Sequence, residues 1–368
     1  MKIELNARVR VIANYLPQFH PIPENDAWWG KGFTEWTNVA KAKPLFRGHY
    51  QPHVPADLGF YDLRVPETRA AQAEMASAYG VEAFCYWHYW FAGRLYLERP
   101  LEEVLKTGEP DFPFCIGWAN ESWTGIWHGA KDRVLQAQTY SGEADHVAHF
   151  RYLQPFFEDD RYLRVDGRAF VLIFKPHSIP KLDRFLDLWR ELAEKAGLGE
   201  LHLVAYMPDD WPAKVHGFDA ATWAHQSVLK SLKGRSKLRR RLREAACLPV
   251  HAYSYSDAVP YMHGPRSPIQ PLPDDHYPSI VAGWDNSPRS GKAATILHGF
   301  APDPFRVHVR NVLDLVKHRR PEERIVFVKS WNEWAEGNYL EPEQRYGRAF
   351  LEVLRDEVNA DRLSMEAC

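Results

Sequence analysis

The sequence predicts a (β/α)8 barrel, an α/β fold in which eight parallel strands alternate with helices. Eight short apolar runs recur along the 368 residues, and segments with helical spacing separate most of them. Each run also ends in polar and aromatic residues, which is typical of a barrel with its active site at the carboxyl ends of the strands. A doubly wound sheet is the alternative, but no G-x-G-x-x-G motif follows a predicted strand to support a nucleotide-binding version.

The eight runs are near-continuous in their apolar character rather than alternating. Such runs indicate strands that are buried on both faces, as in a parallel sheet. In chain order the predicted strands are 9–15, 81–86, 114–117, 169–174, 201–206, 219–223, 278–282 and 324–329.

Six segments between the strands have the spacing of amphipathic helices. They are 67–79, 97–106, 144–157, 181–195, 305–318 and 343–358. In the fourth, Leu182, Phe185, Leu186, Trp189 and Leu192 recur at intervals of three and four residues, which places them on one helix face.

Two long stretches lack any regular pattern. Residues 21–66 are rich in Trp, Pro, Gly and His, and residues 227–276 contain a basic run followed by a Pro-rich tract. We predict a single catalytic domain over residues 1–368, with both stretches as loop insertions at the carboxyl-terminal face of the barrel. The first is expected to cover the barrel mouth.

Composition excludes several classes of protein. The net charge of −2 gives no overall field that would favour nucleic acid or a membrane surface. No apolar stretch approaches the ~20 residues that a transmembrane helix needs. The four cysteines show no paired spacing, and the first residues are too few and too charged for a signal peptide. We therefore expect a soluble, cytoplasmic protein without a disulfide framework.

The segment after the eighth predicted strand carries the strongest functional signal. Glu333 and Glu336 lie three residues apart among tryptophans. Sugar-cleaving sites need paired carboxylates, one protonated and one ionised, and flat aromatic faces that pack against pyranose rings. Because residues i and i+3 point to opposite faces of an extended chain, both acids can serve one site only if the chain turns after Glu333. Gly337 would ease that turn, and the alternative is a solvated loop with ordinary salt bridges.

Other strand ends supply candidate substrate-binding residues. These are Tyr15, Gln18, His20, Trp36, Trp87, His88, Trp118, Asn120, Glu121, Asp285, Trp331, Asn332 and Trp334. Several of these residues could instead have a purely structural role. Tyr15, Gln18 and His20 could form a polar cluster that closes the barrel mouth. Trp36 with Glu35 could anchor a loop, and Asp285 could cap one. Residues 87–90 alternate faces if extended, so about half of them should point inward.

Glu121 is also a rival catalytic residue. It could act as acid/base with Glu333 as nucleophile in the double displacement of many retaining glycosidases. The interpretation that we favour is that Glu121 binds sugar hydroxyls.

We predict neither a metal site nor a cofactor. The chain has 17 histidines but no H-E-x-x-H or C-x-x-C motif, and Pro52 separates His49 from His53. The basic run over 230–243 could bind a lipid-linked pyrophosphate sugar or an anionic membrane surface. A solvated helix face is the simpler interpretation, and an isolated patch in a slightly acidic protein argues against nucleic acid. The run contains Lys230, Lys233, Arg235, Lys237, Arg239, Arg240, Arg241 and Arg243.

Residues 331–337, W-N-E-W-A-E-G, followed by L-E-P at 340–342, resemble the signature of the WbsX-like glycosyltransferase family. That family is related to the endo-α-mannosidases of glycoside hydrolase family 99. Further matches are Y-L-P-Q-F-H at 15–20, W-W-G-K-G-F-T-E-W at 28–36 and W-A-N-E at 118–121. The resemblance spans roughly residues 9–355 and implies a (β/α)8 barrel that works on surface polysaccharide or O-antigen glycans.

The resemblance also implies a mechanism. Glu333 would deprotonate the sugar 2-hydroxyl, which attacks C1 to give a 1,2-anhydro sugar, while Glu336 protonates the leaving oxygen and later activates water or an acceptor. The anomeric configuration would be retained. We therefore expect a retaining glycoside hydrolase or transglycosylase that takes an oligosaccharide or polysaccharide substrate. The alternatives are a glycosyltransferase with an activated sugar donor and a non-catalytic glycan-binding barrel.

Overall fold

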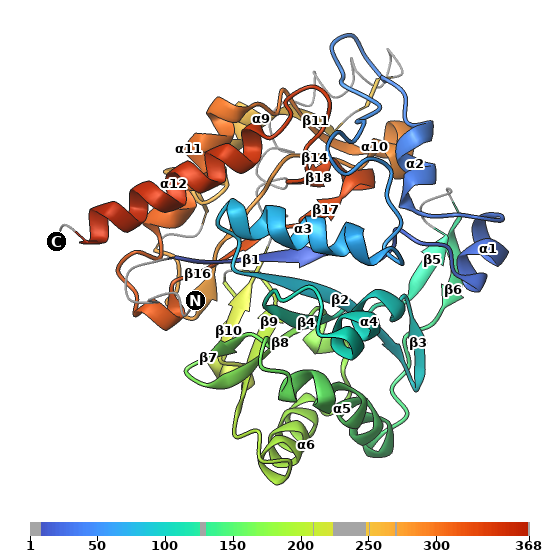
Figure 1. Cartoon of the computed structure of the whole chain (residues 1–368), viewed down its shortest axis with the longest axis vertical. Helices are drawn as coiled ribbons and strands as arrows, with labels where there is room; N and C mark the ends of the chain where they lie inside the picture. The colour runs from blue at the N-terminus through green and yellow to red at the C-terminus, as the bar shows by residue number, and fades with distance from the viewer. Residues whose placement is uncertain are drawn as a thin grey trace.

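A computed structural model describes residues 9–125, 130–208, 210–223, 248–249, 251–268 and 271–366. The basic run over 230–243, with its proposed lipid-linked or anionic ligand, and much of the insertion predicted at 227–276 lie outside the described residues. The rest of the chain forms a parallel sheet surrounded by helices (Figure 1).

The central sheet is a barrel of parallel strands, as predicted. Its strands, in the order in which they pair, are β1 (Arg10–Tyr15), β2 (Ala83–Phe91), β4 (Phe114–Trp118), β8 (Arg168–Ile173), β9 (Leu201–Tyr206) and β10 (Ala220–Thr222). On its other side β1 pairs in parallel with β16 (Ile325–Val328). Two short strands lie between β10 and β16. They are β12 (His276–Tyr277), which pairs with β10, and β13 (Ser279–Ile280), which pairs with β16. Only Pro278 separates β12 from β13, so this one stretch of chain closes the barrel.

Burial explains why these segments form strands. β1, β2, β4, β9 and β16 are buried at every residue. A strand that is covered on both faces is apolar over most of its length, which is why all eight predicted runs correspond to barrel strands.

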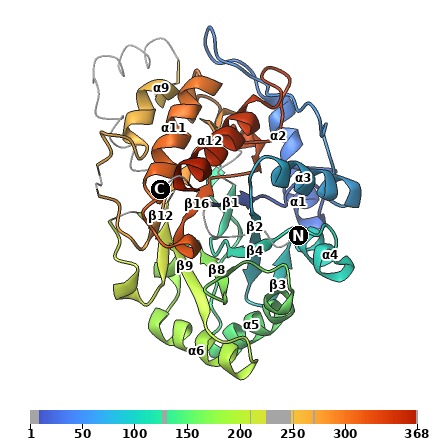
Figure 2. The same cartoon turned by 60° about the vertical axis from the view of Figure 1, so that its left-hand side comes forward.

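The six predicted helices are confirmed, and they cover the outside of the barrel (Figure 2). They are α3 (Pro66–Ala78), α4 (Arg99–Thr107), α5 (Glu143–Glu158), α6 (Leu182–Lys195), α11 (Pro302–Asp314) and α12 (Ala349–Glu366). The last begins six residues later than predicted, because Glu343 is buried in a turn. Its carboxylate accepts the backbone N–H groups of Arg345 at 2.9 Å and Tyr346 at 2.5 Å.

The insertion at 21–66 is not wholly irregular, contrary to the prediction. It contains two short helices, α1 (Pro23–Trp29) and α2 (Glu35–Lys41). Each has only seven residues, too few to show a clear helical period. Their local signals are a proline in the first turn of α1 and a Thr34 capping box for α2.

Smaller strands and helices extend the barrel. β2 continues into a hairpin with β3 (Arg94–Tyr96), and β5 (Trp123–Gly125) pairs with β6 (Ala130–Gln136) beside α1. The other strands and α-helices of the described residues are β7 (Arg164–Val165), β11 (His251–Ser254), β14 (Trp284–Asp285), β15 (Thr295–His298), β17 (Asn332–Glu333), β18 (Asn338–Tyr339), α9 (Tyr255–Ala258) and α10 (Ser287–Ser290). Within the described part of the chain, no helix has the length and apolar character needed to cross a membrane.

Candidate active site

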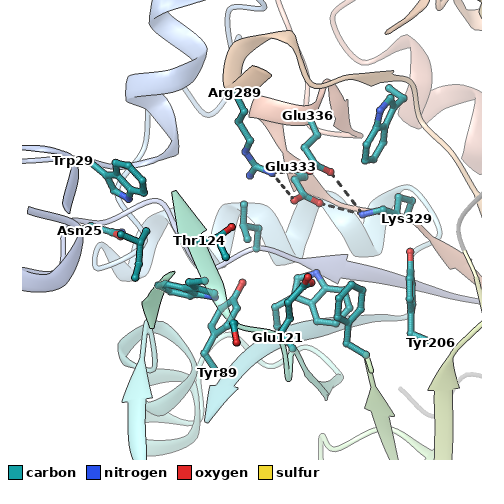
Figure 3. Close-up of a pocket in the computed structure, with 18 residues that line it drawn as sticks. Asn25, Trp29, Tyr89, Glu121, Thr124, Tyr206, Arg289, Lys329, Glu333 and Glu336 are labelled. Carbon is teal, nitrogen blue, oxygen red and sulfur yellow. Dashed lines mark hydrogen bonds and ion pairs between the residues drawn. The ribbon is translucent and has the colours of Figure 1, made fainter. Parts of the chain in front are cut away.

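A cavity of about 310 Å³ opens at the carboxyl ends of the barrel strands (Figure 3). Leu16, Phe174 and Lys329 come directly after β1, β8 and β16, and α1 contributes Asn25 and Trp29 from the insertion. Much of its wall is aromatic: Trp29, Trp87, Tyr89, Trp123, Phe174, Tyr206 and Trp284. The cavity therefore combines an apolar wall with a few polar groups, as ligand sites in proteins generally do.

The two predicted catalytic acids lie together in this cavity. Glu333 ends β17, a short 3-10 turn covers Trp334–Glu336, and β18 follows in antiparallel pairing with β17. The required turn after Glu333 is thus present. Gly337 closes it with φ 56°, and a Cβ atom there would lie 2.9 Å from the Asp285 Cβ. Both its backbone conformation and its close approach to Asp285 favour glycine.

Backbone-directed hydrogen bonds fix this hairpin to the first strand of the barrel. The Asn332 side chain accepts the N–H of Leu16 at 2.8 Å and donates to the carbonyl of Leu16 at 3.1 Å. The N–H of Trp331 donates to the carbonyl of Asn14 at 2.7 Å. Because β1 and β16 are neighbours, these bonds hold the acids at a fixed place on the rim.

A buried carboxylate, Glu341, supports the hairpin from behind. It accepts hydrogen bonds from Trp334 Nε1 at 2.6 Å, Gln72 Nε2 at 2.6 Å and the Tyr61 hydroxyl at 2.8 Å. Burial raises the pKa of Glu341 to about 7. These donors come from α3, the insertion and the hairpin itself, so Glu341 ties three parts of the chain together.

Two cations and a third acid surround Glu333 and Glu336. Arg289 Nη1 lies 3.3 Å from Glu333 Oε1 and 2.7 Å from Glu336 Oε1. Its Nη2 and Nε lie 3.0 and 3.2 Å from Glu35 Oε2. Lys329 Nζ lies 3.2 Å from Glu333 Oε2 and 4.0 Å from Glu336 Oε2. Figure 3 shows the two cations and the two cavity acids grouped on one side, facing Glu121 and Tyr89.

This surrounding moves the pKa values of the two acids in opposite directions. Burial opposes ionisation of Glu333, but the attraction of Lys329 and Arg289 outweighs it, so the pKa of Glu333 lies below its usual value. Burial and the nearby charge of Glu333 together raise the pKa of Glu336 to about 7. At neutral pH one acid is ionised and the other holds a proton for much of the time.

Two predicted binding residues, Trp87 and Glu121, also line the cavity. Trp87 and Tyr89 of β2 face inward, whereas His88 points outward and stacks on His149 of α5, which matches the predicted alternation. Glu121 lies at the cavity wall, where its exposed carboxylate pairs with Lys175 Nζ at 2.6 Å.

The other predicted binding residues at strand ends 1 and 3 do not line the cavity but support its walls. The Tyr15 hydroxyl donates to Gln72 at 2.7 Å, and the carbonyl of Gln18 accepts the N–H of Glu35 at 3.2 Å. His20 is buried, and burial lowers its pKa to about 4. Trp118 packs outward against Phe185 and Trp189, and Asn120 donates to the carbonyl of Lys175 at 2.8 Å.

A similar supporting role fits the predicted residues around the hairpin. Trp36 donates from Nε1 to the carbonyl of Tyr61 at 2.8 Å, as a loop anchor would. Trp331 packs on Phe84, and Trp334 stacks on Tyr339 with ring centres 3.8 Å apart. Asp285 caps its loop by accepting the N–H of Ser287 at 2.9 Å and bonds to His49 at 2.6 Å and Gln51 at 2.7 Å. The side-chain amide of Asn332 is occupied by its hydrogen bonds to the backbone of Leu16.

Sequence reasoning missed several residues of the cavity. The position of Lys329 at the end of the eighth apolar run is a signal that could have identified it. The alternation of β2 could have identified Tyr89, because it faces the same side as Trp87. Arg289 comes from a loop after the seventh strand, and no local pattern marks it. Among the described residues, no group of three or more His, Cys, Asp or Glu is arranged to hold a metal ion.

Comparison with known proteins then places the chain in a family. The model of the family described as "Glycosyltransferase WbsX" matches residues 11–354. The chain belongs to the WbsX glycosyltransferase family. It is also 40% identical over 366 residues to the uncharacterized protein WxcX of Xanthomonas campestris pv. campestris, in two strains. That match covers 97% of this chain and 51% of WxcX, so the chain spans about half the length of these curated relatives.

Solved structures share the fold at low sequence identity. A glycoside hydrolase-like protein is 13% identical with a TM-score of 0.59, and the match covers 96% of this chain and 95% of that one. The GH99 endo-alpha-mannosidase of Bacteroides thetaiotaomicron is 14% identical with a TM-score of 0.56, over 98% and 99% of the two chains. These similarities agree with the (β/α)8 barrel.

Proposed function

We propose that this member of the WbsX family is a retaining glycoside hydrolase or transglycosylase that acts on α-linked sugars of surface polysaccharide. The observation that carries the proposal is the placement of two acids in one cavity, where both contact Arg289 and Glu333 also contacts Lys329. This arrangement lowers the pKa of Glu333 below its usual value and raises that of Glu336 to about 7. Cleavage of a glycosidic bond requires one ionised group that acts as the base and one protonated group that acts as the acid.

The spacing of the acids supports retention rather than inversion. Glu333 Oε1 and Glu336 Oε1 contact the same nitrogen of Arg289, at 3.3 and 2.7 Å. Oxygens that share one nitrogen at these distances lie closer together than the about 6.5–9.5 Å that separates the two carboxyl groups of inverting enzymes.

In the first step, Glu333 takes the proton of the sugar 2-hydroxyl, and that oxygen attacks C1. The C1–oxygen bond to the leaving group breaks as Glu336 donates its proton to the leaving oxygen. In the second step, Glu336 takes a proton from water or an acceptor hydroxyl, which attacks C1 and opens the 1,2-anhydro ring. The sugar O2 recovers its proton from Glu333, so both acids return to their starting state.

The aromatic wall supports a pyranose substrate. Trp87, Tyr89 and Trp284 line the cavity together with the acids. Indole and phenol rings offer apolar faces to the C–H surface of a sugar and leave its hydroxyls to the polar groups. Water as acceptor gives hydrolysis, and a second sugar gives transfer.

The test is turnover of a panel of α-linked oligosaccharides by Glu333→Gln and Glu336→Gln. Each isosteric change removes one proton-transfer group, so we expect activity to fall by about 10²- to 10⁴-fold while folding is kept. NMR of the first-formed product should show the retained anomer. Full activity in both variants would refute the proposal.

Glu121→Gln is the matched control, since Glu121 is a third acid of the same cavity. As a binding residue it should raise KM more than it lowers kcat. If Glu121→Gln abolishes kcat and Glu336→Gln does not, double displacement with Glu121 as acid/base replaces our mechanism.

Two further measurements separate the alternative functions. A nucleotide-sugar donor at 100 times its Kd should stabilise a donor-dependent glycosyltransferase by about 2.7 kcal/mol in thermal unfolding. Glycan binding by the wild type without any turnover would instead identify a glycan-binding barrel.

A further inference from the structure

Five charged side chains form one cluster, and all of them except Glu35 line the cavity. Arg289 and Lys329 are the cations, and Glu35, Glu333 and Glu336 are the acids, each with an oxygen within 3.3 Å of a cation nitrogen. The side chain of Glu35 is 0% exposed and that of Arg289 only 5%. Glu35 belongs to α2 in the insertion, whereas Arg289 belongs to α10, so the cluster joins two loops that are far apart in the sequence.

The guanidinium of Arg289 divides its hydrogen bonds between two sides. Its Nη2 and Nε bind Glu35, and its Nη1 faces both Glu333 and Glu336. Glu35 therefore neutralises much of the positive charge of Arg289, and less of that charge is left to stabilise the ionised forms of the two cavity acids. Lys329 lies nearer to Glu333 than to Glu336, at 3.2 against 4.0 Å.

A charge count fixes the number of protons in the cluster. With every group ionised, two positive and three negative charges leave one excess negative charge. An unpaired buried charge costs several kcal/mol, and one bound proton removes it. Glu333 lies within 3.3 Å of both cations, and Glu35 contacts two nitrogens of Arg289. Glu336 contacts a single arginine nitrogen, at 2.7 Å, and its distance to Lys329 is 4.0 Å, so it has the fewest close cation contacts of the three acids.

We propose that Glu35 is a positioning residue that occupies one side of Arg289 and thereby leaves Glu333 and Glu336 with one proton between them at neutral pH. The catalytic consequence rests on the proposed function. Without the charge of Glu35, Arg289 and Lys329 would balance two ionised cavity acids, and the site would contain a base but no acid.

Among the described residues, the other titratable groups around the cluster leave this count unchanged. Tyr89 faces the acids from β2, and burial raises its pKa, so it stays neutral. Tyr206 of β9 lies on the Lys329 side of the cavity. Asp285 has a lowered pKa and is paired with His49, and Glu121 is paired with Lys175.

The test is a carboxyl titration that does not depend on any substrate. Wild-type protein labelled with ¹³C at the glutamate side-chain carboxyl is followed by NMR from pH 4 to pH 9. Burial also raises the pKa of Glu341 to about 7, so a second glutamate resonance should have its midpoint near neutral pH. The Glu336 resonance is the one that is lost in Glu336→Gln.

Two substitutions should move that midpoint in opposite directions. Glu35→Gln removes a negative charge and should lower it by about one pH unit, whereas Lys329→Met removes a positive charge and should raise it by a similar amount. A structural disturbance alone would not give opposite signs. Glu143→Gln, at an exposed ion pair with Arg184, is the control and should leave the midpoint unchanged.

Three results would overturn the proposal. The first is an unchanged midpoint in Glu35→Gln, and the second is a shift of the same sign in both variants. The third is loss of the near-neutral resonance itself in Glu35→Gln, because that loss would mean that the proton is on Glu35. If Glu35→Gln does not fold, Lys329→Met still decides, since a lower or unchanged midpoint contradicts the charge count. Because the titration needs no turnover, it can succeed even if the proposed reaction is wrong.

Discussion

At the scale of single residues, Glu336 is an acid that the fold keeps in an unfavourable place. Its side chain is only 17% exposed, and burial beside Glu333 raises its pKa from 4.5 to about 7. A raised pKa means that the folded state binds this proton more tightly than the unfolded state does. The contribution of Glu336 to stability is therefore full below pH 4.5 and is lost as the pH rises to about 7.

We predict that Glu336→Gln is more stable than the wild type above pH 7. Glutamine resembles the protonated acid at every pH, so the variant avoids a loss on the order of 3 kcal/mol. Glu341, whose pKa burial also raises to about 7, titrates in both proteins and cancels from the difference. Urea unfolding at pH 4.5 and pH 8 measures the effect, and we expect a difference only at pH 8. A variant that is less stable than the wild type at pH 8 would contradict the raised pKa.

At the scale of elements, the hairpin β17–β18 is what brings the two acids into one site. The indole of Trp334 lies at its centre, where it stacks on Tyr339 and donates a hydrogen bond to Glu341 at 2.6 Å. Glu341 in turn binds groups from α3 and the insertion. The position of the hairpin thus depends on a buried carboxylate that is not itself in the cavity.

We predict that Trp334→Phe lowers both stability and activity. Phenylalanine keeps an aromatic ring against Tyr339 but loses the charge-assisted hydrogen bond, which is worth about 1.5–3 kcal/mol. Trp189→Phe is the matched control, because Trp189 is as deeply buried and donates to the carbonyl of His146 at 3.2 Å, away from the cavity. Thermal unfolding should show a loss in both variants, and turnover should fall only in Trp334→Phe. Equal turnover in the two variants would show that the indole does not position the hairpin.

The difference between a residue placed by a regular strand and one placed by a loop explains what could be predicted from the sequence. The strands were predictable because burial on both faces demands continuous apolar runs, and Glu333 and Glu336 were predictable because their spacing and neighbours suit one chemistry. Arg289 was not, because its approach depends on the path of a loop rather than on any period. Many polar and aromatic residues near strand ends also proved to support the walls, since a strand presents only alternate side chains to the cavity. His88, directly beside Trp87, illustrates this.

At the scale of the whole molecule, the two ends of the barrel carry different networks. The carboxyl-terminal end holds the charged cluster of the cavity. At the other end, Arg10 at the start of β1 binds Glu82 at 2.7 Å, Glu322 at 2.7 Å and the carbonyl of Arg164 at 2.9 Å. These partners precede or flank β2, β16 and β8, so one buried guanidinium connects several strands at their amino ends. In barrels of this kind that end generally serves stability and the opposite end serves function.

We predict that Arg10→Met lowers stability but leaves the cavity intact. Methionine fills much of the buried volume but leaves Glu82 and Glu322 without their partner. Because these acids are 26% and 32% exposed, water can hydrate them, and the loss should be about 2–3 kcal/mol rather than that of a fully buried pair. Urea unfolding measures the loss, and the midpoint of the Glu336 titration should stay at its wild-type value in the folded variant. Glu333→Gln, by contrast, should displace the midpoint. A shift of the Glu336 midpoint in Arg10→Met would mean that the two ends of the barrel are coupled, and the division between stability and function would not hold for this fold.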